Sequence, residues 1–244
     1  MKNIKCYGHR GAAGHEPENT LLSIKCGVDL GADWIEVDVH AVGNDLAVIH
    51  DERLEKTTNG YGFVKTKPWD YLRTLDAGKG QTIPTLREVI DCIDCRSGLV
   101  IEIKNHDAAS LVVSEIHNAI FRMGWNYKQF VVSSLNYMEL QLIQCYDPHI
   151  RIALIMGCAI MEYAKFAEQI GAYSLFADKS AVTPDLVEEA HIRGLKVIAQ
   201  AVNTEEEYLL MEAMDIDGVV TDYPDRVISW RFIRYSESSL LALS

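Results

Sequence analysis

Residues 34–40 read Trp-Ile-Glu-Val-Asp-Val-His, and the alternation of side chains in this segment is the strongest indication of the fold. Successive side chains of a β-strand point to opposite faces, so Glu36 and Asp38 share one face and the intervening Ile and Val side chains share the other. The apolar face suits packing against helices, and the acidic face must then point into a barrel near its mouth. The segment therefore predicts an α/β-barrel strand that carries two carboxylates inward.

Residues 99–104 read Leu-Val-Ile-Glu-Ile-Lys and repeat the arrangement. Glu102 and Lys104 share one face, and the two Ile side chains share the opposite one. Branched apolar side chains normally fill the interior of such a barrel, so charged groups there need a reason. The two segments together indicate a polar site at one end of the barrel.

Outward from these segments, short apolar runs alternate with amphipathic helical stretches along the chain, which is typical of parallel strands with crossover helices. Eight such units favour a closed (β/α)8 TIM barrel, because an open doubly wound sheet usually has fewer strands. Such a sheet also has a glycine-rich phosphate-binding loop after its first strand, and residues 8–11 do not match that loop. The predicted strands are 4–9, 34–42, 99–104, 130–134, 151–156, 173–177, 196–202 and 218–221.

Residues 45–84 depart from this alternation of strands and helices. They contain a hairpin-like run at 46–50, followed by a polar stretch that contains glycine. We expect a small insertion after the second strand, on the face where barrel loops form active sites. The length of 244 residues is normal for one barrel. The predicted domain therefore spans 1–244, with the insertion at about 45–84.

The formal net charge of −12 argues against nucleic acid as a partner, because that binding depends on Lys and Arg neutralising phosphates. No apolar run reaches membrane-spanning length, and the residues before the first predicted strand leave no room for an export signal. We expect a cytoplasmic location and no stable membrane insertion. The oligomeric state is left open by the sequence.

Three carboxylates, those of Glu36, Asp38 and Glu102, are predicted to converge from neighbouring strands. They would repel one another strongly unless a cation lies among them. An all-oxygen donor set suits one hard divalent cation, Mg²⁺ or Ca²⁺, better than zinc. The alternative is an internal salt-bridge network in which Lys104 and Arg10 neutralise the acids.

Two histidines are predicted at the same end of the barrel. His9 ends the first strand and His50 ends the hairpin-like run. Histidine titrates near neutral pH, so the pair can divide the duties of general base and general acid. Arg10 offers a planar fork for phosphate oxygens, and Lys104 offers a point charge. These residue types predict a metal-dependent phosphodiesterase.

Seven motifs follow one another along the chain: Gly-His-Arg-Gly at 8–11, Pro-Glu-Asn-Thr at 17–20, Ile-Glu-Val-Asp-Val at 35–39, His-Asp at 50–51 with Thr-Thr-Asn-Gly at 57–60, Ile-Pro-Thr-Leu at 83–86, Ile-Glu-Ile-Lys at 101–104, and Gly-Val-Val-Thr-Asp-Tyr-Pro at 218–224. In content and order they resemble the motifs of the glycerophosphodiester phosphodiesterase family, and the resemblance extends from residue 8 to about 225.

The resemblance implies a TIM barrel with an insertion after the second strand, and hydrolysis of a small-molecule glycerophosphodiester to sn-glycerol 3-phosphate and an alcohol. It also assigns every site residue: metal to Glu36, Asp38 and Glu102, acid and base to His9 and His50, and phosphate contacts to Arg10 and Lys104. The metal is expected to be one Mg²⁺ or Ca²⁺ ion.

One departure concerns the substrate pocket. Gln200 stands where the family commonly has Trp, so glycerol specificity stays open although the phosphodiester chemistry does not depend on it. One alternative is a lysophospholipase D-type lipid phosphodiesterase on the same barrel. Another is a non-catalytic module that binds a phosphate ligand, which the presence of both histidines and all three acids argues against.

Overall fold

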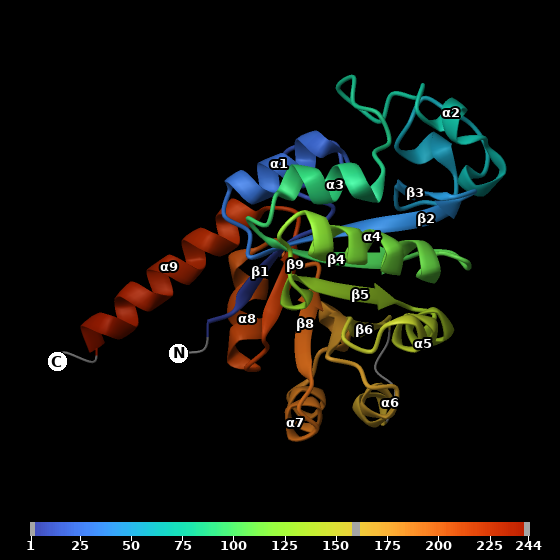
Figure 1. Cartoon of the computed structure of the whole chain (residues 1–244). Helices are drawn as coiled ribbons and strands as arrows, with labels where there is room; N and C mark the ends of the chain where they lie inside the picture. Colours follow the sequence, from blue (N-terminus) through green and yellow to red (C-terminus); the bar gives the residue numbers. More distant parts are fainter. Residues whose placement is uncertain (1–2, 158–161, 242–244) are drawn as a thin grey trace.

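In a computed structural model that describes residues 3–157 and 162–241, eight parallel strands close into a barrel (Figure 1). The strands follow one another around the ring in the order β1-β9-β8-β7-β6-β5-β4-β2, and the pairing of β1 with β2 closes it. The fold-class prediction is confirmed. The strands are β1 (Lys5–Gly8), β2 (Trp34–Val42), β4 (Gly98–Ile103), β5 (Phe130–Ser134), β6 (Arg151–Met156), β7 (Ser174–Asp178), β8 (Lys196–Gln200) and β9 (Gly218–Thr221).

Helices cover the outside of the barrel, and the last one extends away from it (Figure 1). They are α1 (Leu21–Asp29), α3 (Leu86–Ile93), α4 (Ala109–Arg122), α5 (Tyr137–Tyr146), α6 (Tyr163–Gln169), α7 (Pro184–Ile192), α8 (Glu205–Ala213) and α9 (Pro224–Leu241). Within the described ranges, no helix combines the length and the apolar character needed to cross a membrane.

The predicted strands agree closely with the observed ones. The strands predicted at 34–42, 130–134, 151–156 and 218–221 coincide with β2, β5, β6 and β9, and the other four differ by one or two residues at their ends. Such differences are ordinary at strand ends. The run predicted at 46–50 is strand β3 (Asp45–Val48), which pairs antiparallel with β2, so His50 follows this strand instead of ending it.

Strand alternation divides the core into two parts. Tyr7, Val100, Phe176 and Val220 belong to a buried apolar cluster inside the barrel, to which most of the barrel strands contribute. The side chains between them, such as Val37, belong to a larger cluster between the strands and the helices. The interior below the mouth is therefore filled, and the polar groups start where this apolar layer ends.

Helix α7 shows how local sequence sets the helix boundaries. Thr183 caps the helix, because its side chain accepts a hydrogen bond from the backbone N–H of Leu186 at 3.2 Å. Pro184 follows at the first helical position, where its missing N–H costs nothing. Gly194 lies just past the end with a φ of 74°, a left-handed conformation that favours glycine. The sequence thus limits this helix at both ends.

The segment between β2 and α3 forms the insertion. It holds β3, the short helix α2 (Trp69–Leu72) and two turns of 3-10 helix, packed on an apolar cluster of its own that includes Leu54 and Leu72. Arg73 fastens it to α3 through two hydrogen bonds to the carboxylate of Glu88, both 2.8 Å long. The insertion lies beside the carboxyl end of β2 (Figure 1). His50 belongs to this segment. The single-domain assignment of 1–244 stays a prediction.

Candidate active site

A tight turn at residues 8–11 places His9 and Arg10 at the barrel mouth. Gly11 has a φ of 93°, and a Cβ atom on it would lie 2.4 Å from the backbone carbon of Ser23. A Cβ atom on Gly8 would lie 2.2 Å from the carbonyl oxygen of Gly11. Both positions need glycine, because any other residue would clash with backbone. The two glycines of the motif therefore shape the turn, and the two residues between them supply functional groups.

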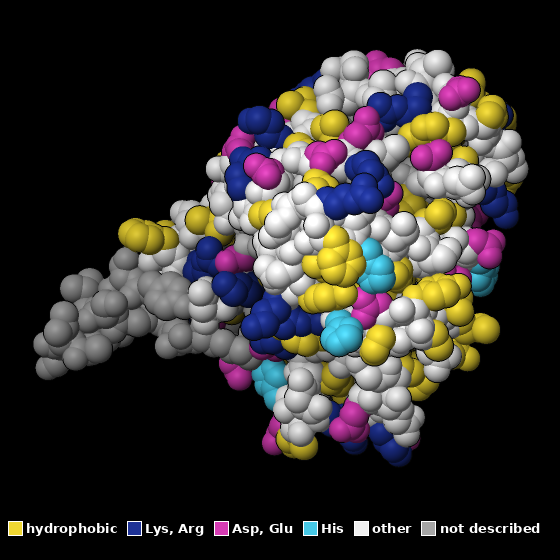
Figure 2. Space-filling model, viewed as in Figure 1, with side chains coloured by type: hydrophobic (Ala, Val, Ile, Leu, Met, Phe, Trp, Pro, Cys, Tyr) yellow, Lys and Arg dark blue, Asp and Glu magenta, His cyan; other side chains and the backbone are white. Residues whose placement is uncertain are grey.

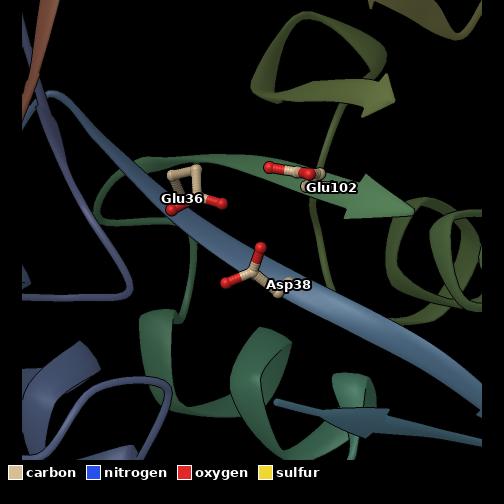
Figure 3. Close-up of side chains that lie close together, drawn as sticks. All are labelled: Glu36, Asp38 and Glu102. Carbon is tan, nitrogen blue, oxygen red and sulfur yellow. The ribbon is translucent and has the colours of Figure 1, made fainter. Parts of the chain in front are cut away.

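The three predicted metal ligands do converge. Asp38 of β2 is the register partner of Glu102 of β4, and one carboxylate oxygen from each of the three acids lies within 4.8 Å of the others. Figure 3 shows the carboxylates of Glu36, Asp38 and Glu102 gathered between these two strands. Their oxygens and spacing suit a hard divalent cation. Of the three, Asp38 lies deepest, at 1% exposure.

The charge of these acids is incompletely balanced within the chain. Burial and the neighbouring Asp38 charge raise the pKa of Glu36 to about 8. Burial and the same charge also raise the pKa of Glu102. The pKa of Asp38 is lowered, because the positive charges of Lys104 and Arg10 outweigh the effect of burial. A cation among the three would favour the charged form of all of them.

The two predicted phosphate-binding residues contact the acids. Lys104 Nζ lies 2.6 Å from Glu102 Oε1 and 3.4 Å from Asp38 Oδ1, and Arg10 Nε lies 3.3 Å from Asp38 Oδ2. The salt-bridge network considered from the sequence is thus present in the geometry. Arg10 Nε and His50 Nδ1 are buried and make no hydrogen bond among the described residues, although each lies 3.3 Å from a carboxylate oxygen, of Asp38 and Asp51 respectively. The network and a ligand site are compatible.

One cavity of about 320 Å³ joins these groups at the mouth. Six of the seven predicted site residues line it, and Asp38 lies behind them. The six are His9, Arg10, Glu36, His50, Glu102 and Lys104. The opposite wall is formed by residues that the sequence did not single out for catalysis, among them Leu135, Met156, Asp178 and Gln200.

His9 is held by a carboxylate that sequence reasoning did not assign. Its Nδ1 lies 2.6 Å from Asp222 Oδ1, and Asn203 Nδ2 donates to the other oxygen of Asp222, also at 2.6 Å. The Asp222 interaction and the Glu36 charge outweigh burial and raise the pKa of His9. Asp222 lies two residues beyond the inward-facing Val220 of β9, so strand alternation was a signal that could have found it.

A second unassigned residue, Asn19, orients Asp38. Its Nδ2 donates to Asp38 Oδ2 at 2.9 Å, and its Oδ1 accepts from the Asp38 backbone N–H at 3.3 Å. Asn19 belongs to the Pro-Glu-Asn-Thr motif at 17–20, and no local pattern there indicates a role for its amide. The other histidine, His50, is placed by its backbone, because its carbonyl accepts a hydrogen bond from His40 Nε2 at 3.1 Å. Burial lowers the pKa of His50.

Known proteins share both the sequence pattern and the fold. The glycerophosphoryl diester phosphodiesterase family model matches residues 9–226. A glycerophosphodiester phosphodiesterase of Caldanaerobacter subterraneus subsp. tengcongensis is 35% identical over 239 residues, which cover 94% of this chain and 98% of that protein. A human lysophospholipase D is 25% identical over 268 residues, which cover 91% of this chain and 84% of that protein.

The solved structure of an Oleispira antarctica phosphodiesterase in complex with the product sn-glycerol-3-phosphate is also similar. Its TM-score is 0.85 at 28% identity, and the match covers 93% of this chain and 96% of that one.

A closed barrel with acids and histidines gathered at the carboxyl ends of its strands is the architecture of a TIM-barrel enzyme. The comparisons narrow that class. The chain belongs to the glycerophosphoryl diester phosphodiesterase family, as the sequence resemblance predicted, and it is an enzyme of phosphoric diester hydrolysis.

Proposed function

We propose that the chain hydrolyses glycerophosphodiesters to sn-glycerol 3-phosphate and an alcohol with the help of one divalent cation. The observation that carries the proposal is the convergence of three carboxylates, two histidines and two basic side chains on one cavity. The names of the Caldanaerobacter relative and the Oleispira complex support the choice of substrate and product.

Glu36, Asp38 and Glu102 would hold the cation. Mg²⁺ and Ca²⁺ both take carboxylate oxygens, and the excess negative charge of the cluster favours either ion. When bound, the cation would stabilise the negative charge that develops on the phosphoryl oxygens. Asn19 keeps Asp38 turned toward the cluster, and the backbone N–H of Arg10 donates to Glu36 Oε2 at 3.1 Å.

Arg10 and Lys104 would bind the phosphodiester. Both line the cavity, and both stay fully charged at neutral pH, because the neighbouring acids raise the pKa of each against the effect of burial. Arg10 can offer two N–H groups to two phosphate oxygens, and Lys104 a single mobile charge. They would fix the phosphorus atom between the two histidines.

His9 and His50 would move the protons. One would remove a proton from the nucleophile, which is either a water molecule or the neighbouring hydroxyl of the substrate, and the other would donate a proton to the leaving alkoxide. Asp222 fixes the ring of His9 and stabilises its imidazolium form. His9 passes through this form in either role: at the start of the reaction if it is the general acid, and after taking up the proton if it is the general base.

Replacing either histidine tests this assignment. We expect His9→Ala and His50→Ala each to lower kcat on glycerophosphocholine by about 10²- to 10⁴-fold, because each removes one proton-transfer group. Binding of Mg²⁺ or Ca²⁺, measured by calorimetry, should survive, since neither histidine belongs to the acidic cluster. His149→Ala is the matched control, because His149 is exposed and does not line the cavity. Full activity in either active-site variant would refute the assignment.

A lipid phosphodiesterase acting on lysophospholipids is the second candidate. Leu135 lines the cavity and is 63% exposed, and the exposed side chains of Met138, Leu142 and Tyr146 continue this apolar surface along α5. Figure 2 shows hydrophobic side chains gathered at the edge of the molecule where Figure 1 labels α5. An acyl chain could lie on such a surface, and one relative is named a lysophospholipase D.

The two candidates differ in the physical state of the substrate. Turnover of lysophosphatidylcholine in micelles is compared with turnover of glycerophosphocholine in solution. The lipid candidate requires faster micellar turnover, and the double variant Met138→Ser/Leu142→Ser should lower it several-fold while activity on glycerophosphocholine is kept. Hydrolysis of the soluble substrate alone would exclude the lipid candidate.

A further inference from the structure

Two polar residues lie on the wall of the cavity that faces the acidic cluster. Asp178 ends β7 and Gln200 ends β8, and the two are register partners. Each lies two residues beyond a side chain of the interior apolar cluster, Phe176 or Ile198, so each is carried inward by strand alternation. Both line the cavity.

The order of the strands places Asp178 and Gln200 on the side of the barrel opposite the proposed metal site. In the ring, β7 lies four strands from β2 in either direction, and β8 lies four strands from β4. Asp178 therefore lies across the barrel from Glu36 and Asp38, and Gln200 lies across from Glu102. A phosphodiester bound at the acidic cluster has two arms, and the cavity extends from the cluster to the ends of β7 and β8, where one arm can lie.

Asp178 carries a negative charge that makes no ion pair within the described part of the chain. Its Oδ1 accepts hydrogen bonds from the backbone N–H of Ser180 at 2.9 Å and from the hydroxyl of Ser180 at 2.5 Å. Within the described part of the chain, its Oδ2 has no hydrogen-bond partner, and no ion pair involves the residue. The adjacent Lys179 pairs with Glu207 instead. The hydrogen bonds from Ser180 and the charge of Lys179 outweigh burial and lower the pKa of Asp178, so the side chain is ionised at neutral pH.

A carboxylate without an ion-pair partner in this cavity would act against an anionic substrate. The phosphodiester carries a negative charge, and two like charges in a partly enclosed space repel. If the arm that reaches β7 carries a positive charge, the same carboxylate attracts it. The neighbouring cavity wall is apolar at Leu135, Ile155 and Met156, which suits the carbon atoms around an ammonium group.

We propose that Asp178 is a specificity-determining residue that binds the ammonium group of the alcohol, so that the enzyme prefers glycerophosphodiesters of amino alcohols such as ethanolamine and choline. The inference rests on the proposed function, because it takes the phosphodiester to bind at the acidic cluster. Gln200, at the position where the family commonly has Trp, adds a polar amide to the cavity wall beside Asp178.

The test is a comparison of three substrates with Asp178→Asn. Asparagine can still accept the hydrogen bonds from Ser180, so the local turn is kept while the charge is lost. We expect kcat/KM for glycerophosphoethanolamine and glycerophosphocholine to fall by roughly 10- to 100-fold, the range of one charge-assisted contact, mainly through KM. For the neutral-headed glycerophosphoglycerol, kcat/KM should stay within about threefold of wild type, or rise.

Asp185→Asn is the matched control, because it removes the same charge from an exposed position on α7, outside the cavity. It should leave all three substrates unchanged. An equal fall for all three substrates in Asp178→Asn, or no fall for any, would overturn the inference while the proposed function stands. Wild-type enzyme that hydrolyses none of the three would instead overturn the proposed function, and the inference with it.

Discussion

Replacing Asp222 by Asn should disable His9 without removing it. The carboxylate of Asp222 accepts two hydrogen bonds, one from His9 Nδ1 and one from Asn203 Nδ2, each 2.6 Å long. An amide has only one oxygen, so its NH2 group must face one of these two nitrogens. If it faces His9, the ring is forced into the tautomer with its proton on Nε2. If it faces Asn203, two donors meet and the contact is lost.

The size of the effect follows from the loss of this contact. A hydrogen bond to a charged group contributes about 1.5–3 kcal/mol, and each 1.4 kcal/mol is tenfold in rate, so kcat should fall roughly 10- to 150-fold. The pH profile should also move. Asp222 stabilises the imidazolium of His9 against the effect of burial. The Glu36 charge also raises the pKa of His9, and the Arg10 charge lowers it. Without the Asp222 carboxylate the pKa of His9 falls, so the part of the pH–rate profile that follows the titration of His9 shifts to lower pH.

Steady-state kinetics on glycerophosphocholine from pH 5 to 10, at saturating metal, measure both effects. Asp225→Asn is the matched control, because it breaks another Asp–His pair, with His15 at 2.7 Å, on the exposed surface. The control should keep the wild-type kcat and profile. If Asp222→Asn also keeps them, the proposed role of Asp222 in positioning His9 is wrong.

Two further predictions concern metal binding and stability. Asn19→Ala should weaken metal affinity about 10- to 100-fold in calorimetry, because Asn19 orients Asp38. Asp147→Asn should lower the free energy of unfolding by about 1–3 kcal/mol at pH 7, since Asp147 accepts hydrogen bonds from His117 and Tyr127. These contacts outweigh burial and lower the pKa of Asp147. Its contribution to the free energy of unfolding is therefore complete above about pH 4. Urea unfolding should show that the difference in this free energy between variant and wild type narrows below that pH. Equal affinities in the first case, or a pH-independent difference in the second, would contradict the reasoning.

Strand alternation explains why so much of this molecule could be predicted. The period of two in β2 and β4 placed Glu36, Asp38 and Glu102 on the inward face before any strand pairing was known. The same rule applied to the last inward position of the other strands would have pointed to Asp178 and Asp222. Those residues were missed because a single carboxylate at a strand end, without a second one on the same face, is common in loops and helix caps.

Local sequence patterns were enough to predict the eight-unit fold, the inward face of each strand and the residue types at the mouth, because these depend on neighbours within a few positions of the chain. Which of these groups meet became clear only from the folded barrel. Asp222 reaches His9 across 213 positions because β9 pairs with β1 next to the closure of the barrel, and Asp178 faces the acidic cluster because closure sets β7 opposite β2. Ring closure is a property of all eight strands together, so no local pattern can express it.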